Sequence, residues 1–188
     1  MRALLIGGGT ALALCSGAAA QTDHSRMTHS TNGPKPMGPP GPTLPTPDYL
    51  TAAGQSDQFE VQSGMMAEKM GRMPAVKSFG KMMVTEHGKT TRELMNAVKA
   101  SGMSPPPPPP LKPEQQAMLD DLRTKSGDDF DRTYVSQQMM AHQEALSVQT
   151  GYAAGGDMPK IKATAAKTAP IVQSHINMLG SMQTKMGG

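Results

Sequence analysis

The sequence predicts an all-α protein, an antiparallel four-helix bundle with a longer, proline-rich connection between its second and third helices. Three observations carry this prediction. Four long segments repeat apolar residues at three- and four-residue steps, as a helix with one buried face does. Short breaks containing glycine or proline separate the members of two pairs of these segments. No segment alternates apolar and polar residues in the manner of a half-buried strand.

The composition fits one domain with extensions. The 188 residues are 37% hydrophobic and only 3% aromatic, with no tryptophan and 18 methionines, so methionine must fill much of the core. The net charge of +3 is spread over scattered basic and acidic residues. Nucleic-acid binding needs a clustered basic face, commonly with stacking aromatics, and we therefore expect no nucleic-acid partner.

Residues 1–20 have the plan of a secretory signal peptide. A positive charge at Arg2 precedes an apolar run that ends at Leu14, and small residues follow up to Ala20. The apolar run is shorter than the ~20 residues that a spanning helix needs. Cleavage after Ala20 would remove Cys15, the single cysteine, and leave no span in the mature chain. We expect export to the periplasm, either free there or associated with the outer membrane.

Residues 21–47 are rich in Pro, Gly, Ser and Thr and hold few large apolar side chains. Such a segment cannot bury enough surface to offset its ordering entropy, which predicts a disordered tether. His24 and His29 lie in it. They are candidates for weak metal binding, but we favour the interpretation that they belong to a solvated tail.

The folded domain is expected over residues 48–186, and its first two helices over 48–71 and 74–100, with Pro74 in the first turn of the second. The expected buried face of the first helix has Glu60 beside it and consists of Tyr49, Leu50, Ala53, Val61, Gly64 and Met65. The second face is clearer and consists of Val76, Phe79, Gly80, Met83, Leu94 and Val98. His87 lies on this second face. A buried histidine needs a partner, because an unpaired buried polar group costs roughly 1–3 kcal/mol.

The second half repeats this pattern. Pro105–Pro110 should form stiff polyproline II, and a helical piece from Pro113 should break at Gly127. Ser126 with Asp129 predicts a capping box that restarts the helix. His142 lies on the apolar face of this third helix, which should end near Ala154. A fourth helix over about 158–185 carries His175, and Pro170 predicts a kink in it.

The polar core residues are expected at a similar depth along the bundle. We expect both tight turns at the same end, and counting from them puts Glu60, His87 and His142 at similar depths, with His175 about one helical turn away. These four residues are the candidate metal ligands, and they suit iron, copper or zinc. The alternative is a hydrogen-bonded core network of the same histidines with Glu60 or a hydroxyl.

The methionines near the histidines also allow two interpretations, metal ligands or core residues. Met83, Met139 and Met178 lie three or four residues from a histidine, and thioethers turned inward would favour Cu(I). Methionine at helical spacing is more often core filler, and that reading is favoured.

The sequence lacks the motifs of several common enzyme classes. A di-iron carboxylate centre needs Glu-x-x-His on two helices, whereas Glu86 here precedes His87 directly and should face outward. There is no G-x-S-x-G elbow and no phosphate-binding glycine loop in the predicted domain. We therefore assign no catalytic or organic-cofactor-binding residue, and the sequence favours a binding or structural protein over an enzyme.

The chain resembles a family of bacterial secreted proteins of unknown function, labelled predicted outer-membrane proteins, that have a ferritin-like four-helix fold. The matching positions are Glu60, Val76-Lys77-Ser78-Phe79, Met83-Val84-Thr85-Glu86-His87, Phe130-Asp131-Arg132-Thr133-Tyr134-Val135, His142, Pro170 and His175. Ala169 replaces the usual leucine before the proline, and Ala141 replaces the usual acid before the third-helix histidine. The resemblance implies a fold and export, but it implies no reaction.

Two functions therefore stand open, and a third, an oxidase of the ferritin-like kind, is the least favoured because the Glu-x-x-His pairs are missing. The first is an exported bundle that binds iron or copper at Glu60, His87, His142 and His175, in envelope metal handling or stress response. The second is a non-catalytic structural or interaction module of the envelope, with the histidines as buried structural groups and an envelope protein as partner.

Overall fold

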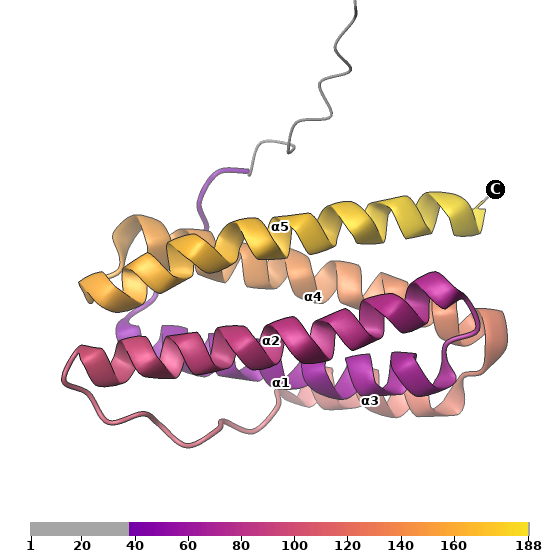
Figure 1. The fold of residues 1–188 in the computed structure, drawn as a ribbon, viewed down its shortest axis with the longest axis horizontal. Helices are drawn as coiled ribbons and strands as arrows, with labels where there is room; N and C mark the ends of the chain where they lie inside the picture. Colours follow the sequence, from indigo (N-terminus) through magenta and orange to yellow (C-terminus); the bar gives the residue numbers. More distant parts are fainter. Residues whose placement is uncertain (1–37, 188) are drawn as a thin grey trace, which may run out of the picture. The chain divides into compact units, whose positions relative to one another are not determined.

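The structure is a computed structural model that describes residues 38–187. Within them lie the helices α1 (Thr46–Met70), α2 (Pro74–Ala100), α3 (Pro113–Thr124), α4 (Gly127–Gly155) and α5 (Pro159–Gly187) (Figure 1). That range contains no strand. The prediction of an all-α fold is therefore confirmed, with α3 as a short additional helix.

The predicted signal peptide and most of the predicted tether lie outside the described residues. The end of the tether segment is described, and it contacts α4. The Gly41 amide donates to the Thr150 hydroxyl at 3.3 Å, and the Thr43 hydroxyl donates to the Gly151 carbonyl at 3.2 Å.

The helices form two antiparallel hairpins that pack side by side. α1 pairs with α2 and α4 with α5, while α1 also packs on α4 and α2 on α5 (Figure 1). The Asp131 carboxylate, near the start of α4, accepts the backbone N–H groups of Arg72 and Met73 in the α1–α2 turn, at 2.9 and 2.7 Å. Lys160, at the start of α5, contacts the carbonyl of Ala100 at the end of α2. The two tight turns thus lie at opposite ends, and the expectation that they share one end is wrong.

The long connection between α2 and α4 explains this arrangement. A helix of 27 residues such as α2 is about 40 Å long. The six prolines span about 19 Å as polyproline II, and the 12 residues of α3 add about 18 Å. The connection can therefore return along the bundle, so that α4 starts beside the α1–α2 turn and runs parallel to α2. Side-chain amides of Gln55 and Gln58 on α1 donate to carbonyls of the proline run.

The core consists of two apolar clusters with polar residues between them. One lies near the α1–α2 turn and is built mainly from Val76, Phe79, Met83, Leu122, Phe130, Tyr134 and Leu179. The other lies near the α4–α5 turn and is built mainly from Tyr49, Leu50, Leu94, Val98, Tyr152 and Ile161. His87, His142 and His175 come between these two clusters along their helices.

The apolar face expected for α2 is buried throughout, as predicted. On α1 the expectation fails in part, because Met65 is 55% exposed while Phe59 and Ser63 are buried. The backbones of α1 and α2 approach closely at two glycines. A Cβ atom on Gly80 would lie 2.6 Å from the carbonyl oxygen of Gly64, so neither position has room for a side chain.

Two local features predicted from the sequence, at Ser126 and Pro170, can be compared with the structure. Ser126 stands at the N-cap of α4, as predicted, but its side chain makes no capping hydrogen bond, so the predicted capping box is wrong. Pro170 lies inside α5, and the helix continues on both sides of it.

None of the helices within residues 38–187 combines the length and apolar content that crossing a membrane requires.

Candidate metal centre

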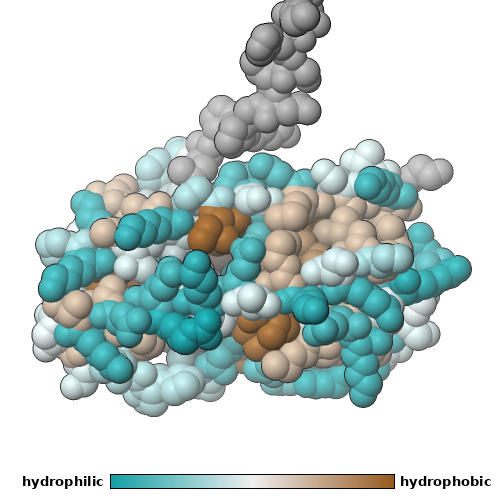
Figure 2. Space-filling model, in the orientation of Figure 1, coloured by the Kyte–Doolittle hydropathy of each residue, from teal (hydrophilic) through white to brown (hydrophobic). Residues whose placement is uncertain are grey.

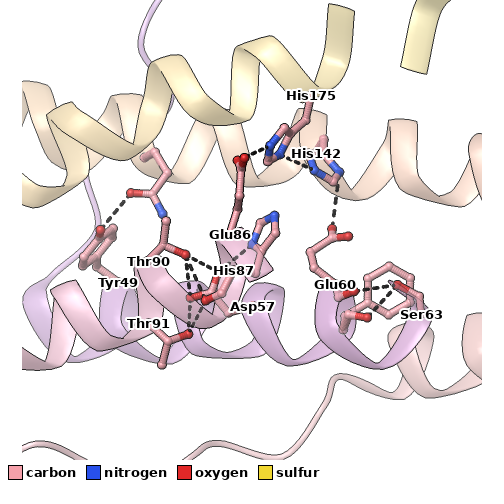
Figure 3. A network of polar contacts seen from close by, with 12 residues as sticks. Tyr49, Asp57, Glu60, Ser63, Glu86, His87, Thr90, Thr91, His142 and His175 are labelled. Atoms are coloured by element: carbon pink, nitrogen blue, oxygen red, sulfur yellow. Dashed lines mark hydrogen bonds and ion pairs between the residues drawn. The ribbon is translucent and has the colours of Figure 1, made fainter. Parts of the chain in front are cut away.

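Three histidines from three helices meet in the middle of the bundle. His87 on α2, His142 on α4 and His175 on α5 are 3%, 0% and 1% exposed. Their ring centroids form a nearly equilateral triangle with sides of 5.6, 5.6 and 5.2 Å (Figure 3). We call these residues the histidine triad. They meet although the turns lie at opposite ends, because each stands near the middle of its helix.

In each ring, the nitrogen that points away from the triad bonds to an oxygen atom. Nδ1 of His87 lies 2.8 Å from the Asp57 carboxylate, and Nε2 of His175 lies 2.8 Å from the Glu86 carboxylate. Nδ1 of His142 lies 2.9 Å from the backbone carbonyl of Gln138. A carbonyl or carboxylate oxygen accepts, so these three nitrogens are the N–H donors. In a neutral imidazole the other nitrogen then carries a lone pair.

The remaining nitrogens therefore present lone pairs to one another. Nε2 of His142 lies 3.2 Å from Nδ1 of His175, and Nε2 of His87 is buried with no hydrogen-bond partner. One ring nitrogen from each histidine lies within 4.8 Å of the others. Two lone pairs at 3.2 Å repel unless a cation, either a proton or a metal ion, stands between them.

The spacing fits a metal ion with small side-chain adjustments. Imidazole nitrogens bind zinc at about 2.0–2.1 Å, which places two nitrogens of a tetrahedral site about 3.3 Å apart. The His142–His175 pair already has that separation. The hydrogen bonds to Asp57 and Glu86 also match the carboxylate–histidine–metal arrangement that orients metal-binding rings.

Glu60 lies behind the triad and does not join it. Its Oε1 is 3.4 Å from Nδ1 of His142, the nitrogen that faces away from His175. Both carboxyl oxygens are buried without a hydrogen-bond partner, and burial raises the pKa of Glu60 to about 7. Of the four candidate ligands, the structure thus brings three histidines together and places Glu60 next to one of them (Figure 3).

Burial and the surrounding charges act differently on the three rings. Burial, followed by the charge of His87, lowers the pKa of both His142 and His175, and it does so strongly for His142. Burial also disfavours the charged form of His87, but the Asp57 hydrogen bond and the nearby carboxylates outweigh it, so the pKa of His87 is raised. Under acidic conditions a proton therefore enters the triad first at His87.

Asp57 is a site residue that the sequence reasoning missed. Besides His87, its carboxylate accepts the hydroxyls of Thr91 at 2.6 Å and Thr90 at 3.3 Å. The signal was present in the sequence. Asp57 lies three residues before Glu60 on the same side of α1, and the two threonines lie one helical turn after His87.

Glu86 was expected to face outward, and that expectation is wrong. It is true that Glu86 points about 100° away from His87 on α2. A helix in a four-helix bundle, however, has two neighbours on different sides. His87 faces the centre and α1, while Glu86 faces α5, where its long side chain reaches Nε2 of His175 with 40% of its surface exposed.

The Phe79 ring lies close to the triad, and three methionines lie in or against the adjoining apolar cluster. The Phe79 ring centroid lies 6.1 Å from that of His142 and 5.9 Å from that of His175. Met83 is fully buried in the apolar cluster, and Met139 and Met178 pack against that cluster. These contacts favour the core interpretation for Met83, while Met139 and Met178 lie partly buried at the edge of the cluster.

Comparisons with known proteins identify relatives by family and by fold. The model of a family described as "Domain of unknown function (DUF4142)" matches residues 31–182. A solved DUF305 fragment from Deinococcus radiodurans is similar over 77% of this chain and 99% of its own, with 14% identity and a TM-score of 0.65. A "putative secreted protein DUF305" from Streptomyces coelicolor is similar over 74% and 92%, with 11% identity and a TM-score of 0.62. No curated protein sequence gives a match.

Proposed function

The chain belongs to the DUF4142 family, which carries no assigned function, and we propose that its bundle binds a transition metal at the histidine triad. The ligands are Nε2 of His87, Nε2 of His142 and Nδ1 of His175. The biological role is metal handling in the cell envelope, by storage or buffering. Both the predicted signal peptide and the description of the Streptomyces neighbour support export.

One observation carries the proposal. Nε2 of His142 and Nδ1 of His175 are 3.2 Å apart, and the N–H group of each ring is already used elsewhere. Buried polar groups normally find a partner, because leaving one unpaired costs roughly 1–3 kcal/mol. A cation between the lone pairs supplies that partner, and a metal ion does so for His87 as well.

The donor set favours copper or zinc over iron. Imidazole suits zinc, copper and iron alike, but oxygen-rich sets suit the harder ions. The three nitrogens are neutral donors, and the nearest carboxylates, those of Asp57 and Glu86, bind the outward nitrogens. Glu60 lies behind His142, 3.4 Å from its outward nitrogen, and is not a ligand in this proposal. Three protein ligands leave a fourth coordination position open.

Metal analysis tests the proposal. The protein is purified without a histidine tag, incubated with Cu(II) or Zn(II), desalted and analysed for bound metal per chain. We expect one equivalent in the wild type and in the double variant His24→Ala/His29→Ala, which removes the histidines outside the described residues. We expect none in His87→Ala. Equal, near-zero metal in all three proteins would refute the proposal, as would metal that disappears only with His24 and His29.

A second candidate function is an interaction module of the envelope, with the triad as a structural group. The polyproline segment favours it, because Pro106, Pro107 and Pro108 are exposed while Gln58 holds Pro109 against α1. Such segments are recognised by aromatic grooves on partner proteins. Replacing these three prolines by Ala should then abolish capture of one defined envelope protein without changing bound metal. Unchanged capture would argue against this function.

A further inference from the structure

We propose that a methionine-lined pocket between α2 and α5 is a second metal site, selective for a soft monovalent ion, Cu(I). We call it the methionine pocket; its sulfur-bearing residues are Met82, Met178 and Met182. Its ligands differ from those of the histidine triad, so the proposal does not rest on the proposed function.

Three methionines line one hollow. The pocket has a volume of about 320 Å³. Met178 and Met182 are four residues apart and lie on the same side of α5, and Met82 stands opposite them on α2. Figure 2 shows a moderately hydrophobic surface over the C-terminal half of α5 and the facing first turns of α2. Methionine has three rotatable side-chain bonds, so the sulfur atoms can adjust to a bound ion.

The remaining lining selects the kind of ion. The described residues that complete the wall are Ala75, Ser78, Phe79, Ser181 and Lys185. None of them carries a carboxylate, and Lys185 adds a positive charge. Hard divalent ions such as Mg²⁺ and Ca²⁺ need several oxygen ligands, which this wall does not offer. Thioether sulfur is a soft, neutral ligand that selects Cu(I), and a single positive charge is the least opposed by Lys185.

Phe79 connects the pocket with the centre of the bundle. It forms part of the pocket wall, and its ring centroid lies 6.1 Å from that of His142 and 5.9 Å from that of His175. Phe79 therefore lies next to both sites. A Cu(I) ion that moved from thioethers to imidazoles would exchange sulfur ligands for nitrogen ligands with no change of oxidation state.

The experiment is an anaerobic Cu(I) titration against a chromophoric Cu(I) chelator, with the full chain and with variants. We expect one Cu(I) per chain in the methionine pocket of the wild type, and a second if the triad also takes Cu(I). The double variant Met82→Leu/Met178→Leu keeps side-chain volume but removes two sulfur atoms, and it should lose one equivalent or bind it at least about tenfold more weakly. The matched control Met65→Leu/Met140→Leu alters two methionines that are each 55% exposed, and it should bind as the wild type does.

The triad variant His142→Ala separates this proposal from the proposed function. If the triad also takes Cu(I), this variant loses the second equivalent and keeps the one in the methionine pocket. If His142→Ala changes nothing while Met82→Leu/Met178→Leu loses Cu(I), the triad does not take Cu(I) and the methionine pocket stands. Unchanged Cu(I) binding in Met82→Leu/Met178→Leu, with wild-type helical circular dichroism, overturns the pocket. An equal loss in the Met65→Leu/Met140→Leu control overturns it as well.

Discussion

The bundle contains two buried polar regions, and they differ in how completely their groups are paired. Near the α4–α5 turn, the Tyr49 and Tyr152 rings stack at 4.0 Å, and both hydroxyls have partners. Tyr49 donates to Gln149 at 2.8 Å, and Tyr152 bonds with Thr46 at 2.6 Å. We call this region the tyrosine end cluster. The other region is the histidine triad with its neighbours.

The triad region leaves several polar atoms without partners. Within residues 38–187, six buried side-chain atoms lack a hydrogen bond. Five of them belong to His87, Glu60, Tyr134 and Gln138, and none belongs to the tyrosine end cluster. A paired network stabilises a fold, whereas an unpaired one costs stability and needs another reason to exist. The comparison therefore assigns structure to one region and binding to the other, and four predictions test that division.

The largest expected effect is on metal affinity, which should depend on the histidine triad and not on the tyrosine end cluster. His175→Ala removes one of three ligands and should weaken Cu(II) or Zn(II) binding by more than about 100-fold, the upper limit for groups that only orient a ligand. Tyr49→Phe removes a hydroxyl from the tyrosine end cluster and should leave affinity unchanged. Isothermal titration calorimetry measures both. Similar affinities for the two variants would contradict the division.

The next effect concerns the cost of the unpaired carboxyl. Burial raises the pKa of Glu60 from 4.5 to about 7. Between these values the folded state keeps a proton that the unfolded state releases, so this contribution to stability is present below pH 4.5 and is lost as pH rises to 7. Glu60→Gln abolishes that loss. The variant should be more stable than wild type by roughly 3 kcal/mol at pH 8 and similar at pH 4.5. Urea unfolding measures it, and equal stability at pH 8 would show that the carboxyl is solvated.

A smaller effect is expected from the carboxylate that orients His87. Asp57→Asn should weaken metal binding about 10–100-fold, as the loss of a carboxylate that orients a metal-binding histidine typically does. Asp57 also raises the pKa of His87, so a proton competes with the metal there, and wild-type affinity should rise as pH increases through the pKa of His87. This rise should shift to lower pH in Asp57→Asn. The exposed Asp48→Asn is the matched control, and an equal loss there would show a mere charge effect.

The smallest effect compares two buried tyrosine hydroxyls. Tyr152→Phe removes paired bonds and should destabilise the metal-free protein by about 1 kcal/mol or more. Tyr134→Phe removes a hydroxyl that has no partner and should be neutral or slightly stabilising. Thermal or urea unfolding compares the two. A larger destabilisation by Tyr134→Phe would mean that its hydroxyl is paired after all.

The helices were predictable because their patterns are local. The buried face of α2 follows the three- and four-residue repeat from Val76 to Val98, and the structure confirms it. The face of α1 was harder to define, because polar Glu60 and Ser63 occupy buried positions while Met65 is exposed. The direction of α4 depends on a crossing connection whose path no local pattern specifies. The ferritin-like part of the family resemblance stays a prediction, since the similar structures described above are DUF305 proteins.

The three histidines could be singled out from the sequence, but the depth count that put them at one level wrongly assumed both tight turns at one end, and their contacts could not be predicted. The three histidines were found because a histidine on an apolar face stands out. Their partners Asp57 and Glu86 were missed because both lie at helix–helix boundaries, where the neighbouring helix decides which side chains are reached. Glu60 was grouped with the histidines by depth alone, and the orientation of its side chain toward the rear of His142 depends on packing.

The most direct test of the account is a crystal structure of the untagged protein with one equivalent of Cu(II) or Zn(II), with the metal located by its anomalous scattering. We expect one strong peak about 2.0–2.1 Å from Nε2 of His87, Nε2 of His142 and Nδ1 of His175. A metal bound elsewhere, with these three nitrogens keeping the arrangement described above, would contradict it.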